Sequence, residues 1–275
     1  MDVLALSSPP QEHARFHRPA ALPGVEALHA TFIHHRYPAH VHDYWVIARV
    51  DCGAAAFELD GRWHTAAAGS TFIIPPGAAH TGESATDRGY SYRVLYLDWP
   101  AYADGAGPPQ AEDSLLGSPI SHDRRCAQSL DQLHQAIIQP GRALEQGEAL
   151  AAVSHALRDA IRPSAGRLGR GRHPAVARAE AFIHERWWEN FTLHELAAAA
   201  DVSPFHLVRL FHRNIGMPPS AYRRALRVQA AQKLLRRGEP AGGVALTCGF
   251  YDQAHLARHF KAVTGVTPSH YAHAG

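Results

Sequence analysis

The sequence predicts an α+β protein of two domains, with a β domain in the N-terminal half and an all-α domain in the C-terminal half. Between residues 28 and 99, short runs of β-branched and aromatic residues alternate with Gly, Pro and Asp turns. Between residues 174 and 275, apolar residues recur at helical spacing and one unit occurs twice. The 275 residues suffice for two domains of ordinary size.

The repeat appears when the sequence is shifted by 49 positions, which aligns residues 206–222 with residues 255–271. Eight of the seventeen aligned pairs are identical, among them Arg209 with Arg258. A period this long, present only twice, does not fit a solenoid. We interpret it as two copies of one supersecondary unit.

Each copy has the pattern of a helix-turn-helix. In the first copy, Thr192 is placed to cap a short helix, and Glu195 completes a capping box. Ser203 then caps a second helix, which Gly216 ends. In the second copy, Asp252 caps the corresponding helix. We call the second helix of each copy its recognition helix.

Residues 174–271 resemble the DNA-binding domain of the AraC/XylS family of bacterial transcription regulators. The resemblance rests on the segment 245–250 (Ala-Leu-Thr-Cys-Gly-Phe) and on Asp252, Gln253, Leu256, Arg258, Phe260, Lys261, Gly265, Thr267, Pro268 and Tyr271. It implies a domain of seven helices that binds double-stranded DNA. A long helix near 220–237 would separate the two recognition helices by about one turn of DNA, ~34 Å.

The DNA contacts are expected from residues that face away from the apolar stripe of each recognition helix. Arg209 and Arg258 occupy the same register, and arginine commonly binds guanine O6 and N7 in the major groove. The predicted base contacts are Phe205, His206, Val208, Arg209, Gln253, Ala254, Ala257 and Arg258. The predicted phosphate contacts are Ser203, His212, Arg223, Arg224, Arg227, Lys261 and the linker arginines. Since the two helices differ, we expect an asymmetric DNA site. Alternatively, both arginines only bind phosphates or pair with an acidic neighbour.

The net charge is unevenly distributed along the chain. Residues 1–161 carry −7, residues 162–173 carry +4 and residues 174–275 carry +5. Positive charge attracts a polyanion such as DNA. The C-terminal part is therefore the part expected to bind nucleic acid.

The N-terminal region predicts a β sandwich or barrel. Strands are expected at 44–50, 56–59, 62–65, 71–74 and 90–97. Asp60-Gly61 is a strong signal for a two-residue hairpin turn. Gly69, the segment 75–77 (Pro-Pro-Gly) and His80 resemble the second motif of the cupins, which are small jelly-roll barrels.

The first cupin motif is only partly present. His40 and His42 supply the paired histidines, which alternation places on one face of a strand. His34 stands where the family has a glycine, and Val46 or Ile47 stands where it has a glutamate. Only Glu83 or Asp43 would then be in reach to supply a carboxylate.

Three interpretations of His40, His42 and His80 stay open. They pack or form hydrogen bonds inside the barrel, they contact an organic effector, or they hold a divalent transition metal such as zinc, nickel, copper or iron. The predicted effector-binding residues are His40, His42, Tyr44, His80 and Tyr92. The aromatic residues are alternatively barrel core.

Two amphipathic helices are expected at 123–139 and 142–161. The first carries an apolar stripe of Cys126, Leu130, Leu133 and Ile137, and the second carries Leu144, Leu150, Val153, Leu157 and Ile161. These stripes either pack on the barrel or, as in many members of the family, form a homodimer contact, which we expect. The domain boundaries follow: a loose segment (1–23), a cupin-like sensor domain (24–121), the helical pair (122–161), a linker (162–173) and the double helix-turn-helix (174–275).

The composition narrows the class of protein further. The longest apolar runs fall short of the ~18 residues of a membrane span, and residues 1–23 lack the apolar core of a signal peptide. Cys52, Cys126 and Cys248 are too widely spaced for a zinc ribbon or a disulfide framework. We therefore expect a cytoplasmic protein with no membrane partner.

These observations together predict a transcription regulator that a small-molecule effector controls, with no catalytic residues. An activator would also contact RNA polymerase. The alternative is a metal-dependent cupin enzyme fused to a helical domain, because one fold can host many activities.

Overall fold

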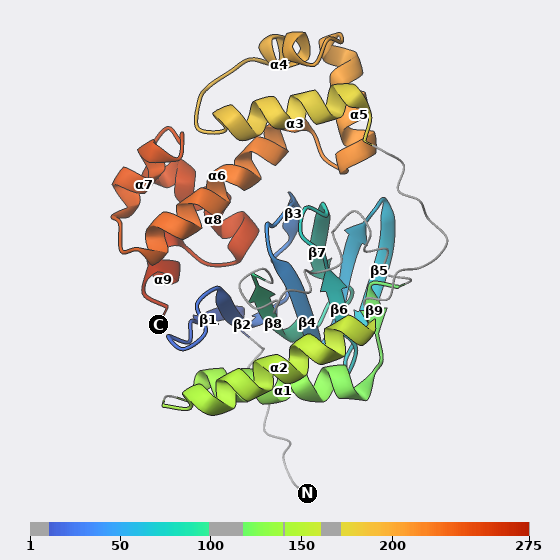
Figure 1. Ribbon diagram of the computed structural model, residues 1–275, viewed down its shortest axis with the longest axis vertical. Coiled ribbons are helices and arrows are strands. Elements are labelled where there is room, and N and C mark those ends of the chain that lie inside the picture. The colour runs from blue at the N-terminus through green and yellow to red at the C-terminus, as the bar shows by residue number, and fades with distance from the viewer. Residues whose placement is uncertain (1–10, 99–117, 140, 161–171, 275) are drawn as a thin grey trace, which may run out of the picture.

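The computed structural model describes residues 11–98, 118–139, 141–160 and 172–274. In Figure 1 an N-terminal part of strands and two helices lies against a C-terminal part of seven helices. The strands are β1 (His13–His17), β2 (Val25–Phe32), β3 (Tyr37–His40), β4 (Trp45–Leu59), β5 (Arg62–Ala67), β6 (Thr71–Ile74), β7 (His80–Ser84), β8 (Tyr90–Leu97) and β9 (Ile120–Ser121).

The strands form two antiparallel layers that share β4. One layer has the order β1-β2-β8-β4-β6-β9, and the other joins β3, β7 and β5 to the second half of β4. The strands expected at 44–50 and 56–59 are one continuous strand, β4. Within β4 the residues between the two runs form a register shift after Val50 and a positive φ of 71° at Gly53. The predicted hairpin turn is confirmed, with φ of 52° at Asp60 and 71° at Gly61.

The N-terminal segment is not loose over its described length. Residues 13–17 form β1, which pairs with β2 and buries Ala14 and Phe16. The sequence alone does not reveal this strand, because the segment is rich in Pro and Ala and because the strand forms by pairing with β2, further along the chain.

Helices α1 (Arg124–Ile138) and α2 (Ala143–Ala160) lie close to their predicted positions and cover one face of the sheet (Figure 1). Leu133 and Leu157 are fully buried in a cluster with sheet residues such as Trp45 and Ile47. The stripes therefore pack on the barrel, so these side chains do not form the expected dimer contact. The homodimer itself stays a prediction. Leu144 is 73% exposed and does not belong to the buried stripe.

The C-terminal part consists of α3 (Pro174–Arg186), α4 (Leu193–Ala199), α5 (Pro204–Ile215), α6 (Pro219–Arg236), α7 (Ala241–Thr247), α8 (Gln253–Thr264) and α9 (Pro268–Ala272). The predicted caps are confirmed. Thr192 and Glu195 form a capping box, and Ser203 and Asp252 accept hydrogen bonds from backbone amides of α5 and α8. The predicted linker falls largely on residues 161–171, outside the described residues.

The two parts share a continuous apolar core. Phe16 of β1 packs edge-on against Tyr271 of α9, with ring centroids 5.1 Å apart. Buried Glu26 accepts a hydrogen bond from the Tyr271 hydroxyl and pairs with Arg236 of α6 and Arg18. Within the described ranges, no helix is long and apolar enough to cross a membrane.

Candidate functional site

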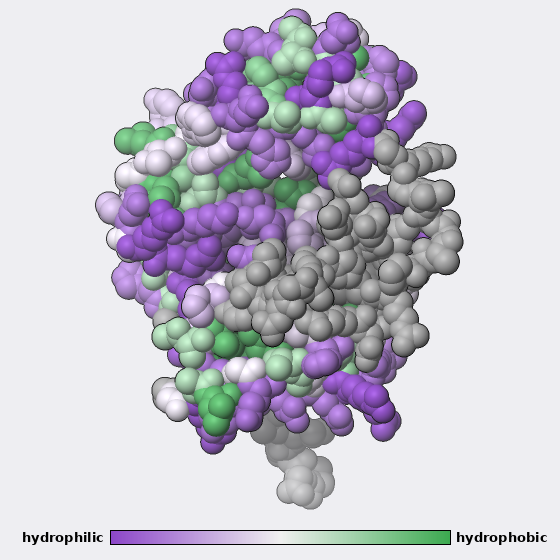
Figure 2. Space-filling model, in the orientation of Figure 1, coloured by the Kyte–Doolittle hydropathy of each residue, from purple (hydrophilic) through white to green (hydrophobic). Residues whose placement is uncertain are grey.

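The recognition helices α5 and α8 present the predicted base contacts at the surface. Phe205, Arg209, Gln253, Ala254 and Arg258 are exposed, and Phe205 is 80% exposed. The other three, His206, Val208 and Ala257, are partly exposed. All eight side chains are thus at least partly accessible, and their role as base contacts stays a prediction. Figure 2 shows hydrophilic side chains over much of the helical part, with apolar patches between them.

The helices end in equivalent ways because the repeat extends to their caps. Gly216 after α5 and Gly265 after α8 both adopt the left-handed conformation, with φ of 85° and 79°. Both glycines also lie against the N-terminal part. A Cβ on Gly216 would lie 3.2 Å from Ala79, and a Cβ on Gly265 would lie 2.7 Å from the Phe32 ring. The β domain therefore contacts the same end of both recognition helices.

Four of the six predicted phosphate contacts are exposed: Ser203, His212, Arg224 and Lys261. Arg223 is half-buried, donates to the carbonyls of Glu189 and Phe191, and stacks 4.4 Å from the Phe191 ring centroid. Arg172 is the linker arginine among the described residues, and it pairs with Glu180 at 2.8 Å.

Arg227 is not a phosphate contact, and that prediction is wrong. Its side chain is buried, and its guanidinium donates to the carbonyls of Trp187, Trp188, Glu189 and Gly249. Burial, with the nearby Arg223, lowers the pKa of Arg227 to about 10, so it remains charged at neutral pH. Arg227 therefore joins the loop before α4 to the turn of the second helix-turn-helix.

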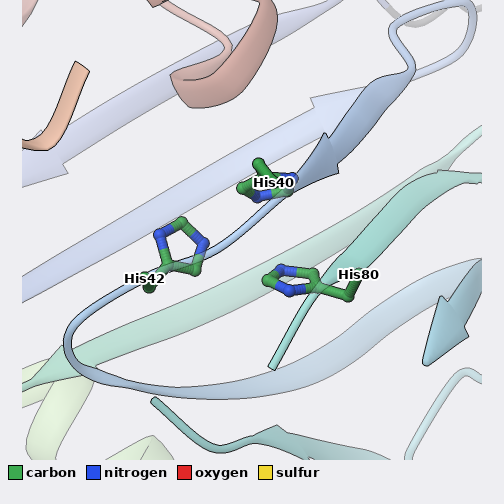
Figure 3. A group of neighbouring side chains, drawn as sticks. All are labelled: His40, His42 and His80. Carbon is green, nitrogen blue, oxygen red and sulfur yellow. The ribbon is translucent and has the colours of Figure 1, made fainter. Parts of the chain in front are cut away.

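A second candidate site lies inside the β domain, where His40, His42 and His80 converge. Figure 3 shows the three rings turned toward one common space, two from the segment at the end of β3 and one from β7. Their ring centroids lie 4.3 to 5.1 Å apart. All three are buried and line one cavity of about 50 Å³. The predicted convergence of these histidines is confirmed.

Backbone carbonyls orient two of the three rings. His40 Nδ1 lies 2.7 Å from the Pro38 carbonyl oxygen, and His80 Nδ1 lies 3.0 Å from that of Ala78. A carbonyl only accepts, so each Nδ1 carries the proton and donates it. Burial lowers the pKa of His40 to about 4 and holds the pKa of His42 and His80 well below the usual range. The rings are therefore neutral at physiological pH.

Tyrosines complete the polar part of the cavity. Tyr92 lines it as predicted, and its hydroxyl lies 3.0 Å from that of Tyr37. Burial raises the pKa of both phenols well above the usual range, so they stay protonated. Tyr44 does not line the cavity; it stacks behind His42, with ring centroids 4.7 Å apart.

No carboxylate accompanies the three histidines in the described part of the chain. Val46 lines the cavity at one of the two positions considered for the family's glutamate. Glu83 pairs with Arg36, and Asp43 pairs with Lys233 of α6 at 2.7 Å. The two carboxylates considered from the sequence are thus engaged elsewhere.

The DNA-binding part also contributes to the cavity wall, which the sequence did not indicate. Val263, near the end of α8, lines the cavity. Val41, between the two histidines of the β3 segment, packs in the core of the first helix-turn-helix, and its carbonyl accepts a hydrogen bond from Gln229 of α6 at 2.8 Å. The sequence carries no signal for these contacts, because they depend on how the two parts dock.

Comparison with known proteins agrees with this architecture. Residues 22–157 match the family described as AraC-like ligand binding domain, and residues 196–274 match the family described as helix-turn-helix domain. The chain is 28% identical over 239 residues to the uncharacterized HTH-type transcriptional regulator YbfI of Bacillus subtilis, covering 84% of this chain and 86% of YbfI. It is 36% identical over 84 residues, 30% of this chain and 24% of its relative, to the bifunctional transcriptional activator/DNA repair enzyme Ada of Escherichia coli.

A solved structure with the same fold is that of wild-type ToxT from Vibrio cholerae bound to an unsaturated fatty acid. It superposes with a TM-score of 0.51 at 12% identity and covers 98% of both chains. The chain therefore belongs to the AraC family of helix-turn-helix transcriptional regulators and carries an AraC-like ligand-binding domain ahead of its DNA-binding domain.

Proposed function

We propose that this regulator binds a specific, asymmetric DNA sequence and that a small ligand in the histidine-lined cavity controls this binding. The observation that carries the proposal is the shared contact of the sensor domain with both recognition helices. Gly216 and Gly265, at equivalent ends of α5 and α8, both lie against residues of the β domain. A change in the sensor domain would therefore alter the relative placement of the two helices.

The opposite ends of the recognition helices remain available for DNA. Phe205 and Arg209 on α5 and Gln253 and Arg258 on α8 are exposed near or after the N-terminal caps. Arginine at the same register of each helix suits guanine, and Gln253 suits adenine. Because the remaining neighbours differ between the helices, the two halves of the DNA site should differ in sequence.

The cavity is connected to the same helices by short paths. Val263 of α8 forms part of its wall, and Ala79 next to His80 meets Gly216. A ligand that moves these walls would bias the docked arrangement, and only differential affinity for two arrangements produces such control. The alternative of a metal-dependent cupin enzyme finds no support in the described cavity, where Glu83 and Asp43 are engaged in other ion pairs.

The DNA-binding half of the proposal is tested by selection of bound duplexes from a random pool, with the full-length chain. We expect one motif with unlike halves. Arg209→Ala and Arg258→Ala should each weaken the free energy of DNA binding by about 1–3 kcal/mol and reduce the base preference at one position of the motif. Arg237→Ala is the matched control, an exposed arginine at the C-cap of α6 and therefore outside both recognition helices. Uniform weakening on all sequences would instead assign both arginines to phosphates.

A further inference from the structure

We propose that His40, His42 and His80 bind one divalent ion of the first transition series, and that this ion is the ligand, or part of the ligand, that the sensor domain detects. The regulatory consequence rests on the proposed function, whereas the binding itself does not. Four properties of the cavity lead to this inference: its donor geometry, the orientation of its rings, its size and its charge.

The donor geometry is close to what an ion requires. One nitrogen from each of the three rings lies within 4.8 Å of the other two. A tetrahedral ion with metal–nitrogen bonds of about 2.0–2.1 Å holds its ligand nitrogens roughly 3.4 Å apart. The rings therefore need to approach one another by no more than about 1.4 Å, which side-chain rotation and a small movement of the β3 segment can supply.

The ring orientation is that of metal-binding histidines. Such histidines commonly donate one N–H to a carbonyl and coordinate through the other nitrogen. His40 and His80 donate from Nδ1 to the carbonyls of Pro38 and Ala78, so their Nε2 atoms carry the free lone pair. The two hydrogen bonds hold the rings before any ion arrives.

The size of the cavity selects a small occupant. Pockets for organic ligands usually measure about 300–1,000 Å³. The cavity measures about 50 Å³, which is room for an ion with one or two small ligands such as water. A sugar-sized or larger effector would have to open the barrel.

The chemistry of the donors selects the type of ion. Three neutral imidazoles suit zinc, nickel, copper, cobalt or iron(II), whereas magnesium and calcium prefer oxygen ligands. The described cavity offers no carboxylate, so a bound ion keeps its charge and an open coordination position. That position would take water or a small anion from the cavity.

An ion at this position would act on the parts of the sensor that contact the DNA-binding domain. His40 and His42 flank Val41, whose carbonyl is held by Gln229 of α6, and Asp43 pairs with Lys233 of the same helix. His80 follows Ala79, which lies against Gly216 at the end of α5. Drawing the three rings together therefore moves both contacts at once.

The test measures bound metal by equilibrium dialysis of the full-length, metal-stripped protein against Zn²⁺, Ni²⁺ and Co²⁺ in turn, with Mg²⁺ for comparison. We expect one tight equivalent of at least one transition ion and none of Mg²⁺. His80→Gln and His42→Gln should weaken this binding at least a hundredfold. His80→Cys, which keeps a metal ligand, should retain it for zinc.

Two controls address histidines outside the cavity. His155 is exposed on α2, and His259 lies one turn from His255 on α8, with their Nε2 atoms 3.0 Å apart. His155→Gln and His259→Gln should leave the tight site intact. Loss of binding in His259→Gln, or no tight site in the wild-type protein, would overturn the proposal. Circular dichroism of each variant confirms that it folds.

The regulatory consequence has a separate readout. Affinity for the selected DNA motif should change at least fivefold between metal-stripped and metal-loaded protein, and the change should vanish in His80→Gln. Tight metal binding with no change in DNA affinity would limit the ion to a structural role and overturn its role as effector. Failure to select any DNA motif would instead contradict the proposed function while leaving the metal site in place.

Discussion

Replacement of Arg227 by Ala should destabilise the folded DNA-binding domain rather than remove a contact with a DNA phosphate. The side chain is buried, and its guanidinium donates to four backbone carbonyls, those of Trp187, Trp188, Glu189 and Gly249. A buried carbonyl left without a donor costs about 1–3 kcal/mol, and these four carbonyls are partly buried. Because one group serves all four, the costs do not add.

We therefore expect Arg227→Ala to lower the free energy of unfolding by about 3–5 kcal/mol, more than one unmade hydrogen bond costs and less than the sum of four. This is a large part of the ~5–15 kcal/mol that stabilises a typical domain. Arg227→Lys keeps the charge but lacks the planar fork of donors. Arg227→Lys should therefore lower the free energy of unfolding by roughly half as much as Arg227→Ala.

The assay is urea unfolding of the full-length chain, followed by tryptophan fluorescence, since Trp187 and Trp188 lie beside Arg227. Arg224→Ala is the matched control, because Arg224 is the exposed arginine three residues away on the same helix. That variant should stay within about 0.5 kcal/mol of wild type. Wild-type stability in Arg227→Ala, with the salt slope of DNA binding lower by about one, would refute this account and restore the phosphate contact.

Three further outcomes are expected. Gly265→Ala should loosen the contact between the domains and speed proteolysis between them, because its Cβ would lie 2.7 Å from the Phe32 ring. Gly238→Ala is the control, because Gly238 has a similar positive φ but open space around it. Equally fast proteolysis of both variants would contradict this expectation. In native protein at neutral pH, iodoacetamide should label the exposed Cys52 quickly and leave Cys126 unlabelled. Cys126 is buried, and burial raises its pKa to about 11. Equal labelling of the two thiols in mass spectrometry would contradict the packing of α1 on the sheet. A transition ion present at about a hundred times its Kd should add ~2.7 kcal/mol to the free energy of unfolding and raise Tm by roughly 5–10 °C. An unchanged Tm would contradict a metal site in the folded protein.

The sequence predicts the helical part well because the signals there are local. Ser203, Asp252 and the glycines after each recognition helix specify caps within a few residues of the helices they bound. The convergence of the three histidines was also predictable from their cupin-like spacing. Strand alternation did not place His42, because β3 ends at His40. Short-range sequence patterns therefore suffice to predict both the recognition helices and the histidines of the cavity.

The errors arise where one segment meets another far along the chain. β1 forms because β2 lies beside it, and the stripes of α1 and α2 pack on the sheet because the sheet is nearest. Arg227 has a polar position on its own helix, and only the loop before α4 and the turn at Gly249 bury it. Val263 lines the cavity only because the domains dock, which no local pattern encodes.

The central claim is that DNA recognition and the sensor cavity belong to one switch, and genome-wide mapping of bound DNA in the native host tests it most directly. Wild-type protein should occupy a discrete set of sites that share an asymmetric motif. The double variant Arg209→Ala/Arg258→Ala should lose them, and His80→Gln should keep the motif but not respond to a change in metal supply. Sites that persist in the arginine variant, or a metal response that survives in His80→Gln, would contradict the account.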